Sequence, residues 1–306
     1  MKAPSLPSQL HVFVRDWLSS NNIVLKGSDG TIVIDSGYVR HVPLTLALVA
    51  SRQGLDGAPL TLLVNTHCHS DHMGGNAALA RAYGCPIAVP AGEAPHIACW
   101  DTRALLLDYA GHSADRFTAD VVIHPDTRHV WGGLEWRALA APGHDMGALV
   151  FYNPEHGILI SGDALWENGY GFVMPAEIDP AALPATRATL EMLAALDVRV
   201  VIPGHGDPFT AFIPAVEGAL QRTAAFENDS LRVARHALKV VLAFTLLDKR
   251  RMPLADLPAY VDRVEIYRDI NASCLGLSPL ALAEMLVNDL EKVGAVRRQD
   301  SYLLPR

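Results

Sequence analysis

Residues 66–76 read THCHSDHMGGN. This stretch contains four imidazole or carboxylate side chains, the kind that bind divalent cations: His67, His69, Asp71 and His72. In an extended segment alternate side chains share one side, so His67 and His69 point the same way. A turn then aims Asp71 and His72 at a neighbouring position, and the glycine pair at 74–75 lets the backbone bend tightly. The spacing predicts two adjacent metal ions.

The sequence around this motif predicts a layered α/β protein. The apolar run LTLLVN (60–65) leads directly into the motif, which places the motif in a loop after a strand. NAALARAYG (76–84) is typical of a short helix, and CPIAVP (85–90) of a buried strand. Residues 21–38 contain two runs rich in Ile and Val around the turn 28–30, which indicates a hairpin. Alternating strands and helices favour a layered sheet.

The second half of the chain divides into a β-rich part and a helical part. Short apolar segments follow one another from residue 120 to 163, and a helix over 180–197 precedes a strand at 198–206. We therefore predict a catalytic domain over residues 1–210. Residues 211–306 form a smaller, mainly helical domain, in which Ser278 and Gly294 mark the ends of a helix before two short strands. This order predicts a winged-helix-like module.

Some residues near the motif are candidates for the wall of a substrate pocket. Residues 100–120 have weak periodicity, and we interpret them as an insertion or lid that carries His112. The loop after Asp163 must border any site at that residue. The candidates in that loop are Trp166, Asn168 and Tyr170.

The run THCHSDHMGGN resembles the HxHxDH signature of the metallo-β-lactamase-fold superfamily. The superfamily's three later ligands have counterparts here in the expected order: APGH at His144, ISGD at Asp163 and IPGHG at His205. The resemblance covers roughly residues 11–210 and implies a four-layer αββα sandwich. It assigns one metal to His67, His69 and His144. It assigns the other to Asp71, His72 and His205, with Asp163 bridging the two.

The resemblance also implies a dinuclear metallo-hydrolase. Two divalent cations, with zinc as the first expectation and iron or manganese as alternatives, would supply a bridging hydroxide for an ester, thioester or lactone. Asp71 would orient this nucleophile or accept its proton, as a catalytic residue. Zinc β-lactamases of the main class carry Cys where this chain has Asp163, which disfavours antibiotic hydrolysis. Glyoxalase II is the thioesterase that compares best, although its basic glutathione-binding residues have no match here.

Two other activities on this fold are alternatives. Lactamase-like endoribonucleases also carry a winged-helix-like tail. A phosphodiesterase or endoribonuclease of this kind would act on single-stranded nucleic acid. Against them, the expected recognition helix carries Glu284, Asp289 and Glu291 against Lys292. Persulfide dioxygenases share the fold but use one iron ion with two His ligands and one Asp ligand.

Charge and composition set expectations for partners and compartment. The chain has 25 Lys and Arg against 33 Asp and Glu, a net charge of −8, which favours a small-molecule substrate over nucleic acid or membrane. It has no signal-peptide pattern and no apolar run long enough to span a bilayer, so we expect a cytoplasmic protein. The helical tail offers a surface for a homodimer. The four cysteines, Cys68 among them, have no paired spacing and are expected as reduced thiols.

Overall fold

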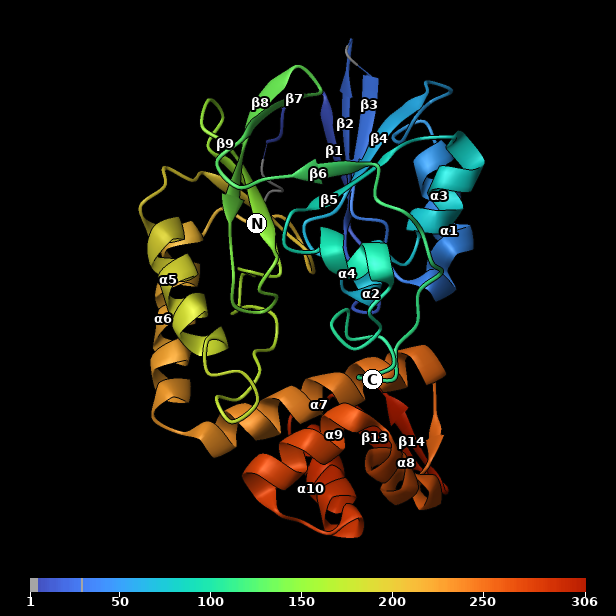
Figure 1. Ribbon diagram of the computed structural model, residues 1–306, viewed down its shortest axis with the longest axis vertical. Coiled ribbons are helices and arrows are strands. Elements are labelled where there is room, and N and C mark those ends of the chain that lie inside the picture. The colour runs from blue at the N-terminus through green and yellow to red at the C-terminus, as the bar shows by residue number, and fades with distance from the viewer. Residues whose placement is uncertain (1–4, 29) are drawn as a thin grey trace.

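Two β-sheets pack face to face, and helices cover their outer sides (Figure 1). The computed structural model describes residues 5–28 and 30–306. Residues 1–4, at the start of the predicted catalytic domain, and Asp29, in the predicted hairpin turn, lie outside the described residues.

The first sheet has six strands in chain order. Its first three strands are antiparallel, and the later ones add in parallel. The strands are β1 (Leu10–Phe13), β2 (Asn22–Gly27), β3 (Gly30–Ile34), β4 (Leu60–Val64), β5 (Ile87–Pro90) and β6 (Val121–Ile123). The predicted hairpin is β2 and β3, and the predicted strand before the motif is β4.

The second sheet has five strands in the order β11-β10-β9-β8-β7. Neighbours are antiparallel except for the parallel pair β10 and β11. Gly132 and Gly133 both have positive φ, 61° and 71°, as a two-residue turn between β7 and β8 requires. The strands are β7 (Arg128–Trp131), β8 (Leu134–Ala140), β9 (Leu149–Asn153), β10 (Ile158–Gly162) and β11 (Val200–Pro203).

Strand alternation explains how each sheet is buried on both faces. In β2, Ile23 and Leu25 point between the sheets while Val24 points to the outer side. In β10, Ile160 points between the sheets and Leu159 to the outer side. Both sheets therefore need helices on their outer faces, which accounts for four layers.

Two sets of helices form these outer layers. The first sheet is covered through residues such as Val49, Leu79 and Ile97, and the second through residues such as Leu190 and Val216. The helices on the first sheet are α1 (Val42–Ala50), α3 (Asn76–Tyr83) and α4 (Ala94–Cys99), with the short turns η1 (Val39–His41) and α2 (Ser70–Met73) beside them. Those on the second are α5 (Ala182–Ala194) and α6 (Phe212–Glu227). The predicted αββα sandwich is confirmed.

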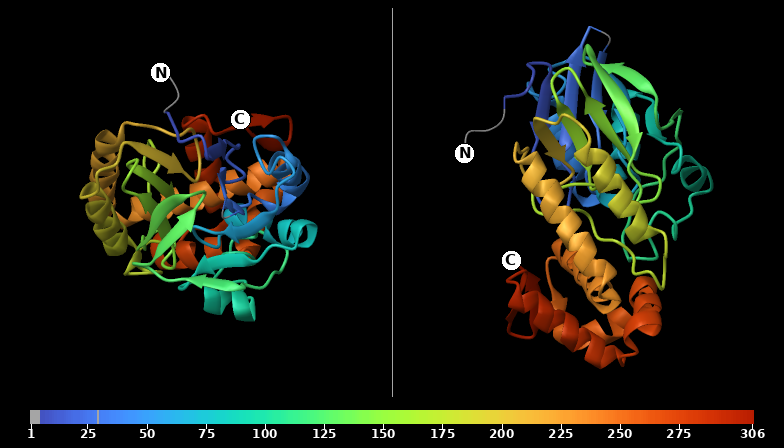
Figure 2. Two further views of the ribbon diagram at one scale, coloured as in Figure 1. Left: turned by 90° about the horizontal axis from the view of Figure 1, so that it is seen from above. Right: turned by 90° about the vertical axis from the view of Figure 1, so that its left-hand side faces the viewer.

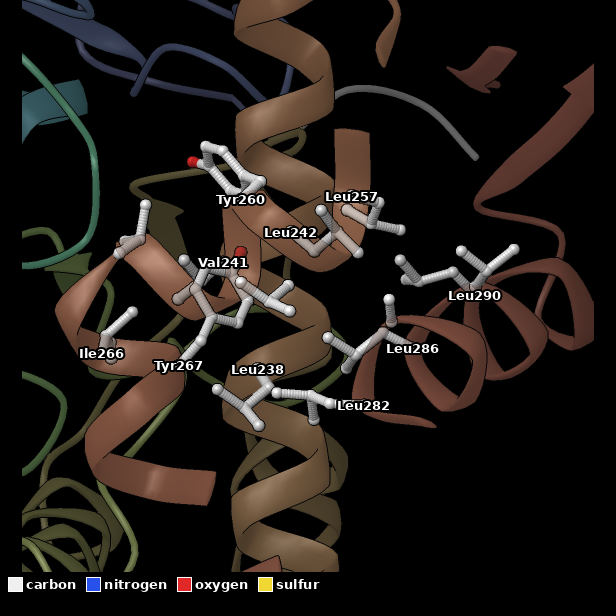
Figure 3. Close-up of a cluster of buried hydrophobic side chains, with 14 of the residues drawn as sticks. Leu238, Val241, Leu242, Leu257, Tyr260, Ile266, Tyr267, Leu282, Leu286 and Leu290 are labelled. Atoms are coloured by element: carbon white, nitrogen blue, oxygen red, sulfur yellow. The ribbon is translucent and has the colours of Figure 1, made fainter. Parts of the chain in front are cut away.

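The last part of the chain forms a helical unit below the sandwich (Figures 1 and 2). Its core lies around α7, where Leu238 and Leu242 pack with Leu257 and Leu286 (Figure 3). The helices are α7 (Ser230–Lys249), α8 (Leu257–Arg263), α9 (Glu265–Ile270) and α10 (Pro279–Lys292), with η2 (Leu254–Asp256) and η3 (Asn271–Leu275). The strands β12 (Met252–Pro253), β13 (Val296–Gln299) and β14 (Tyr302–Pro305) form a small sheet.

The predicted start and end of the helix near the C-terminus are confirmed. The Ser278 hydroxyl accepts a hydrogen bond from the Ala281 amide at 3.2 Å, which caps α10. Gly294 has φ of 74°, and β13 and β14 follow as an antiparallel pair. The domain boundary at residue 211 stays a prediction, and α6, which begins just beyond it, packs on α5 and the sandwich core.

Across the described residues, no single helix has the length and apolar character to cross a membrane. One bent pair of segments, Glu265–Leu275 with Pro279–Lys292, meets those criteria only when the two are counted together.

Candidate metal centre

The sandwich brings four loops to one end of its two sheets. The loop after β4 carries His67, His69, Asp71 and His72, and the last two lie in the short helix α2. The loops after β8, β10 and β11 supply the other three predicted ligands: His144, Asp163 and His205. All seven residues come together there in two adjacent groups.

The first group contains His67, His69 and His144, whose ligand atoms lie within 4.8 Å of one another. His69 Nδ1 is 2.9 Å from His144 Nε2. Burial lowers the pKa of His69 to about 4 and the pKa of His67 well below its ordinary value. Both imidazoles are therefore neutral at physiological pH, which is the form that binds metal ions.

The second group contains Asp71, His72, Asp163 and His205. His205 Nε2 lies 3.0 Å from Asp71 Oδ2, and His72 Nε2 lies 3.4 Å from Asp163 Oδ1. Asp163 Oδ2 is 3.6 Å from His144 Nε2 and 3.8 Å from His205 Nε2. Asp163 therefore faces both groups, as a bridging residue must.

The electrostatics of the second group favour positive charge. Burial opposes ionisation of Asp71, but the neighbouring His72 and His205 outweigh it and hold the pKa of Asp71 at about 2. Burial also disfavours the charged form of His72, but the carboxylates of Asp35 and Asp163 outweigh this and raise its pKa well above the ordinary value. A cation at His72 Nε2 is thus stabilised by its surroundings.

Groups outside the motif orient these ligands. His72 Nδ1 donates to Asp35 Oδ2 at 2.8 Å, and His144 Nδ1 donates to the Phe172 carbonyl at 2.5 Å. Each bond places the proton on the outer nitrogen, so the Nε2 lone pair faces the site. His69 Nε2 lies 3.4 Å from Asp145 Oδ2, which favours a lone pair on its Nδ1 in the same way.

These contacts test whether the residues fit a metal ion. The lone pairs of His69 Nδ1 and His144 Nε2 face each other at 2.9 Å, which a cation between them would stabilise. Among the described residues, His67 Nε2 and His72 Nε2 are buried without a hydrogen-bond partner. Buried polar atoms rarely lack a partner, so imidazole nitrogens that converge without a protein partner are suited to bind a cation. The donor set fits two divalent cations.

Two glycines let the chain approach this cluster closely. A Cβ atom on Gly204 would lie 2.2 Å from Asp163 Oδ1, and one on Gly171 would lie 2.5 Å from the His144 ring. No other residue fits at either place without displacing a predicted ligand. Gly204, the first glycine of IPGHG, is therefore required for the geometry of the site.

An apolar cavity of about 430 Å³ opens beside the cluster. The predicted pocket residues His112 and Trp166 line it, as do Leu106 and Ala110 from the predicted lid. Tyr170 is instead buried, with its hydroxyl 2.8 Å from Thr223 Oγ1, and Asn168 is exposed. Cys68 lies in the core behind the first sheet.

Sequence reasoning missed four residues around the centre. Asp35 directly follows β3 as Asp163 directly follows β10, and that shared place after an apolar strand was the one available signal. Trp17 stacks on the His205 ring with centroids 5.4 Å apart and planes 7° apart, although its chain position carries no motif. Asp145 adjoins a predicted ligand, and the carbonyl of Phe172 has no sequence signature.

Comparisons with known proteins agree with this fold. The hydroxyacylglutathione hydrolase of Rhodospirillum rubrum is 31% identical over 71% of this chain and 76% of its own length. That of Hyphomonas neptunium is 30% identical over 50% of this chain, and the chain spans about half of that relative's length. A metallo-beta-lactamase family protein from Thermus thermophilus covers 99% of this chain and is itself covered completely (100%). It has a TM-score of 0.57 and 20% identity, a likeness in fold.

The match to the family model covers far more of the chain than the short histidine motifs do. The pattern of the metallo-beta-lactamase superfamily extends over residues 15–205, from before β2 to His205, and includes every predicted ligand. The chain belongs to the metallo-beta-lactamase superfamily.

Proposed function

We propose that this protein is a metal-dependent hydrolase of an ester, thioester or lactone. The observation that carries the proposal is the position of Asp163, whose carboxylate faces both groups of predicted ligands. The seven predicted ligands hold two divalent cations in this proposal, with zinc first and iron or manganese as alternatives. Such cations, when bound, lower the pKa of water and polarise a carbonyl oxygen.

The protein's own groups support this chemistry in three ways. Asp71 is ionised at neutral pH, so its carboxylate can orient a water molecule or accept a proton from it. The Trp166 indole donates to Asp163 Oδ1 at 3.1 Å, which limits the carboxylate's rotation. Asp35 fixes the imidazole of His72. The two relatives above are named for hydrolysis of a hydroxyacyl-glutathione, an acyl compound of the proposed kind.

The ion pairs of α10 count against the nucleic-acid alternative. The expected recognition helix is α10, and it carries the carboxylates that the sequence predicted for it. One of them, Asp289, pairs with Arg235 at 2.8 Å. Glu291 pairs with Arg298, one of the two arginines of the strand β13. Neutralised arginines contribute little to phosphate binding.

The proposal is tested by metal content and a substrate panel measured on the same purified protein. The panel holds S-lactoylglutathione, a homoserine lactone, bis(p-nitrophenyl) phosphate and a short single-stranded RNA. We expect close to two metal ions per chain and hydrolysis of an acyl substrate. Asp71→Ala should lower kcat/KM at least about 100-fold, as loss of acid–base catalysis does.

A matched control is Asp197→Ala, because the Asp197 side chain is 82% exposed and lies outside the metal centre. It should leave activity unchanged. If only the RNA is hydrolysed, the acyl-hydrolase proposal is wrong and the protein is an endoribonuclease. One iron ion per chain with oxygen uptake would replace the proposal with the dioxygenase.

A further inference from the structure

Helix α7 has two apolar faces, and one of them is fully buried in the core of the helical unit. Leu238 and Leu242 are fully buried against the neighbouring helices (Figure 3). Leu246 is buried in the same core. A second stripe has the spacing i, i+3, i+4, i+7 and is half-buried: Val240, Ala243, Phe244 and Leu247. All four residues of this stripe line the cavity beside the metal centre. They form a continuous apolar strip along the helix, which we call the α7 stripe.

Other parts of the chain complete the apolar lining. Leu106 and Phe172 line the same cavity and are half-buried. Leu106 has φ of 53°, a left-handed conformation that leucine rarely adopts. Such backbone conformations concentrate where a side chain is held for binding. Here the conformation holds a leucine in the cavity wall, between Leu105 and Leu107, which are buried behind it.

Polar groups in the cavity belong mainly to the metal centre. His69, Asp71, Asp163 and His205 line it on that side. Among the described lining residues, Arg306 is the one with a permanent positive charge, and it is exposed. A glutathione moiety carries two carboxylates and would need several cations or amide donors to replace its water. The lining instead suits an uncharged apolar group.

We propose that the acyl part of the substrate is an apolar chain and that the α7 stripe binds it. This inference rests on the proposed acyl-hydrolase function. For a thioester, water adds its hydroxyl to the carbonyl carbon as the C–S bond breaks, and the second proton goes to the sulfur, which leaves a carboxylic acid and a thiol. The chain of that acid lies between the α7 stripe and Leu106, while its carbonyl faces the metal centre.

The test is a chain-length series on the metal-loaded full-length protein. N-acetylcysteamine thioesters share one neutral leaving group. The acetyl, butanoyl, hexanoyl, octanoyl and decanoyl thioesters therefore differ only in the acyl chain. We expect kcat/KM to rise about two- to fourfold per methylene until the cavity is filled. Glutaryl thioester, which ends in a carboxylate, should be at least about tenfold poorer than hexanoyl thioester.

Failure of the inference differs from failure of the proposed function. If acetyl thioester is hydrolysed and kcat/KM stays flat with chain length, the apolar-chain inference is wrong and the hydrolase proposal stands. If none of the thioesters, the lactone or S-lactoylglutathione is hydrolysed, the proposed function itself is wrong.

Variants on one helix assign the effect to the stripe. Leu247→Ser should lower the octanoyl-to-acetyl ratio of kcat/KM about tenfold, because a serine cannot replace the apolar contact between leucine and the acyl chain. Leu231→Ser is the matched control, since Leu231 lies on α7 at 52% exposure and does not line this cavity. Ala243→Phe adds volume to the stripe and should move the optimum to shorter chains. An equal effect of Leu231→Ser and Leu247→Ser would overturn the assignment.

A binding measurement tests the α7 stripe independently of catalysis. Trp17 and Trp166 line the cavity, so their fluorescence should change when an apolar ligand enters it. Decan-2-one should bind at least about tenfold more tightly than butan-2-one, and Leu247→Ser should reduce this difference. Equal binding of the two ketones by the unaltered protein would contradict the inference.

Discussion

At the scale of single residues, the orientation of His72 depends on a carboxylate far from it in the sequence. Asp35 lies 37 positions upstream and accepts from His72 Nδ1 at 2.8 Å. Its other oxygen accepts the Thr66 amide at 2.9 Å, so the carboxylate itself has a fixed orientation. Asp35 has φ of 58°, a conformation that Asp and Asn tolerate better than most residues. The backbone at the end of β3 is thus bent to aim this side chain.

We predict that Asp35→Asn weakens metal binding about 10- to 100-fold with the fold retained. An asparagine can turn its amide NH₂ toward His72 Nδ1, which favours the proton on Nε2 and blocks the ligand lone pair. Titration against a chromophoric chelator measures the affinity, and kcat/KM with the best acyl substrate should fall in parallel. Asp197→Asn, at an exposed position, is the control. Unchanged affinity in Asp35→Asn would mean that the His72 ring is fixed by packing alone.

The difference between His72 and Asp35 shows what sequence can predict of a site. Local spacing predicted the four ligands of residues 67–72, and the resemblance to the superfamily predicted the three that follow strands beside a glycine: His144, Asp163 and His205. Asp35 belongs to no motif in the sequence. It contacts His72 only because β3 pairs with β4, which brings the ends of the two strands together. The individual ligand roles stay predictions, while the structure places all seven residues in one cluster.

At the scale of elements, α6 and α7 are separate helices, although they follow each other closely in the chain. Asp229 marks the break between them, because its side chain accepts the Arg232 amide at 3.0 Å and so caps the start of α7. The predicted helix of residues 76–84 and the strand of residues 85–90 were found as α3 and β5. The first apolar segment of the predicted β-rich run from residue 120 was found as β6, but this strand joins the first sheet, because it pairs with β5 across the irregular residues 100–120. Periodicity also could not say which partner each face of α7 meets.

The α6–α7 contact predicts a stability loss in acid. His236 on α7 packs against Phe226 of α6, with ring centroids 5.5 Å apart. Burial, followed by Arg222 and Lys239, lowers the pKa of His236 to about 3. Between this value and about 6.5 the unfolded chain binds a proton that the folded chain does not, so stability falls as pH falls. From pH 7 to pH 5 this one group should cost about 2 kcal/mol.

Urea unfolding at pH 7 and pH 5 measures this loss. His236→Phe keeps an aromatic ring beside Phe226 and removes the titrating group, so its free energy of unfolding should depend less on pH by about 2 kcal/mol. The matched control His124→Phe replaces an exposed histidine and should keep the pH dependence of the unaltered protein. The same pH dependence in all three proteins would show that His236 is protonated in the folded state.

At the scale of the whole molecule, the metal centre joins the two sheets. The loop after β4 belongs to the first sheet, and His144, Asp163 and His205 follow strands of the second. Sequence patterns predicted two β-rich halves, each followed by a helix. They could not predict that the two sheets pack face to face with their ligand-bearing loops at the same end, because that depends on the packing of Trp136 and its neighbours between the sheets.

This arrangement makes metal binding a whole-molecule stability effect. In the metal-free protein, several buried carboxylates and imidazoles face one another, and a ligand that binds only the folded chain stabilises it by RT ln(1 + [L]/Kd). Free zinc at about 100 times its Kd should therefore raise the free energy of unfolding by about 2.7 kcal/mol per site. Calorimetry with a chelator and with added zinc measures the change in Tm. Asp163→Ala removes the carboxylate that faces both groups, so it should lose most of the zinc-dependent increase, whereas Asp197→Ala should keep it. If zinc leaves the Tm of the unaltered protein unchanged, the seven residues do not bind it, and the same titration with iron and manganese decides whether they bind another cation.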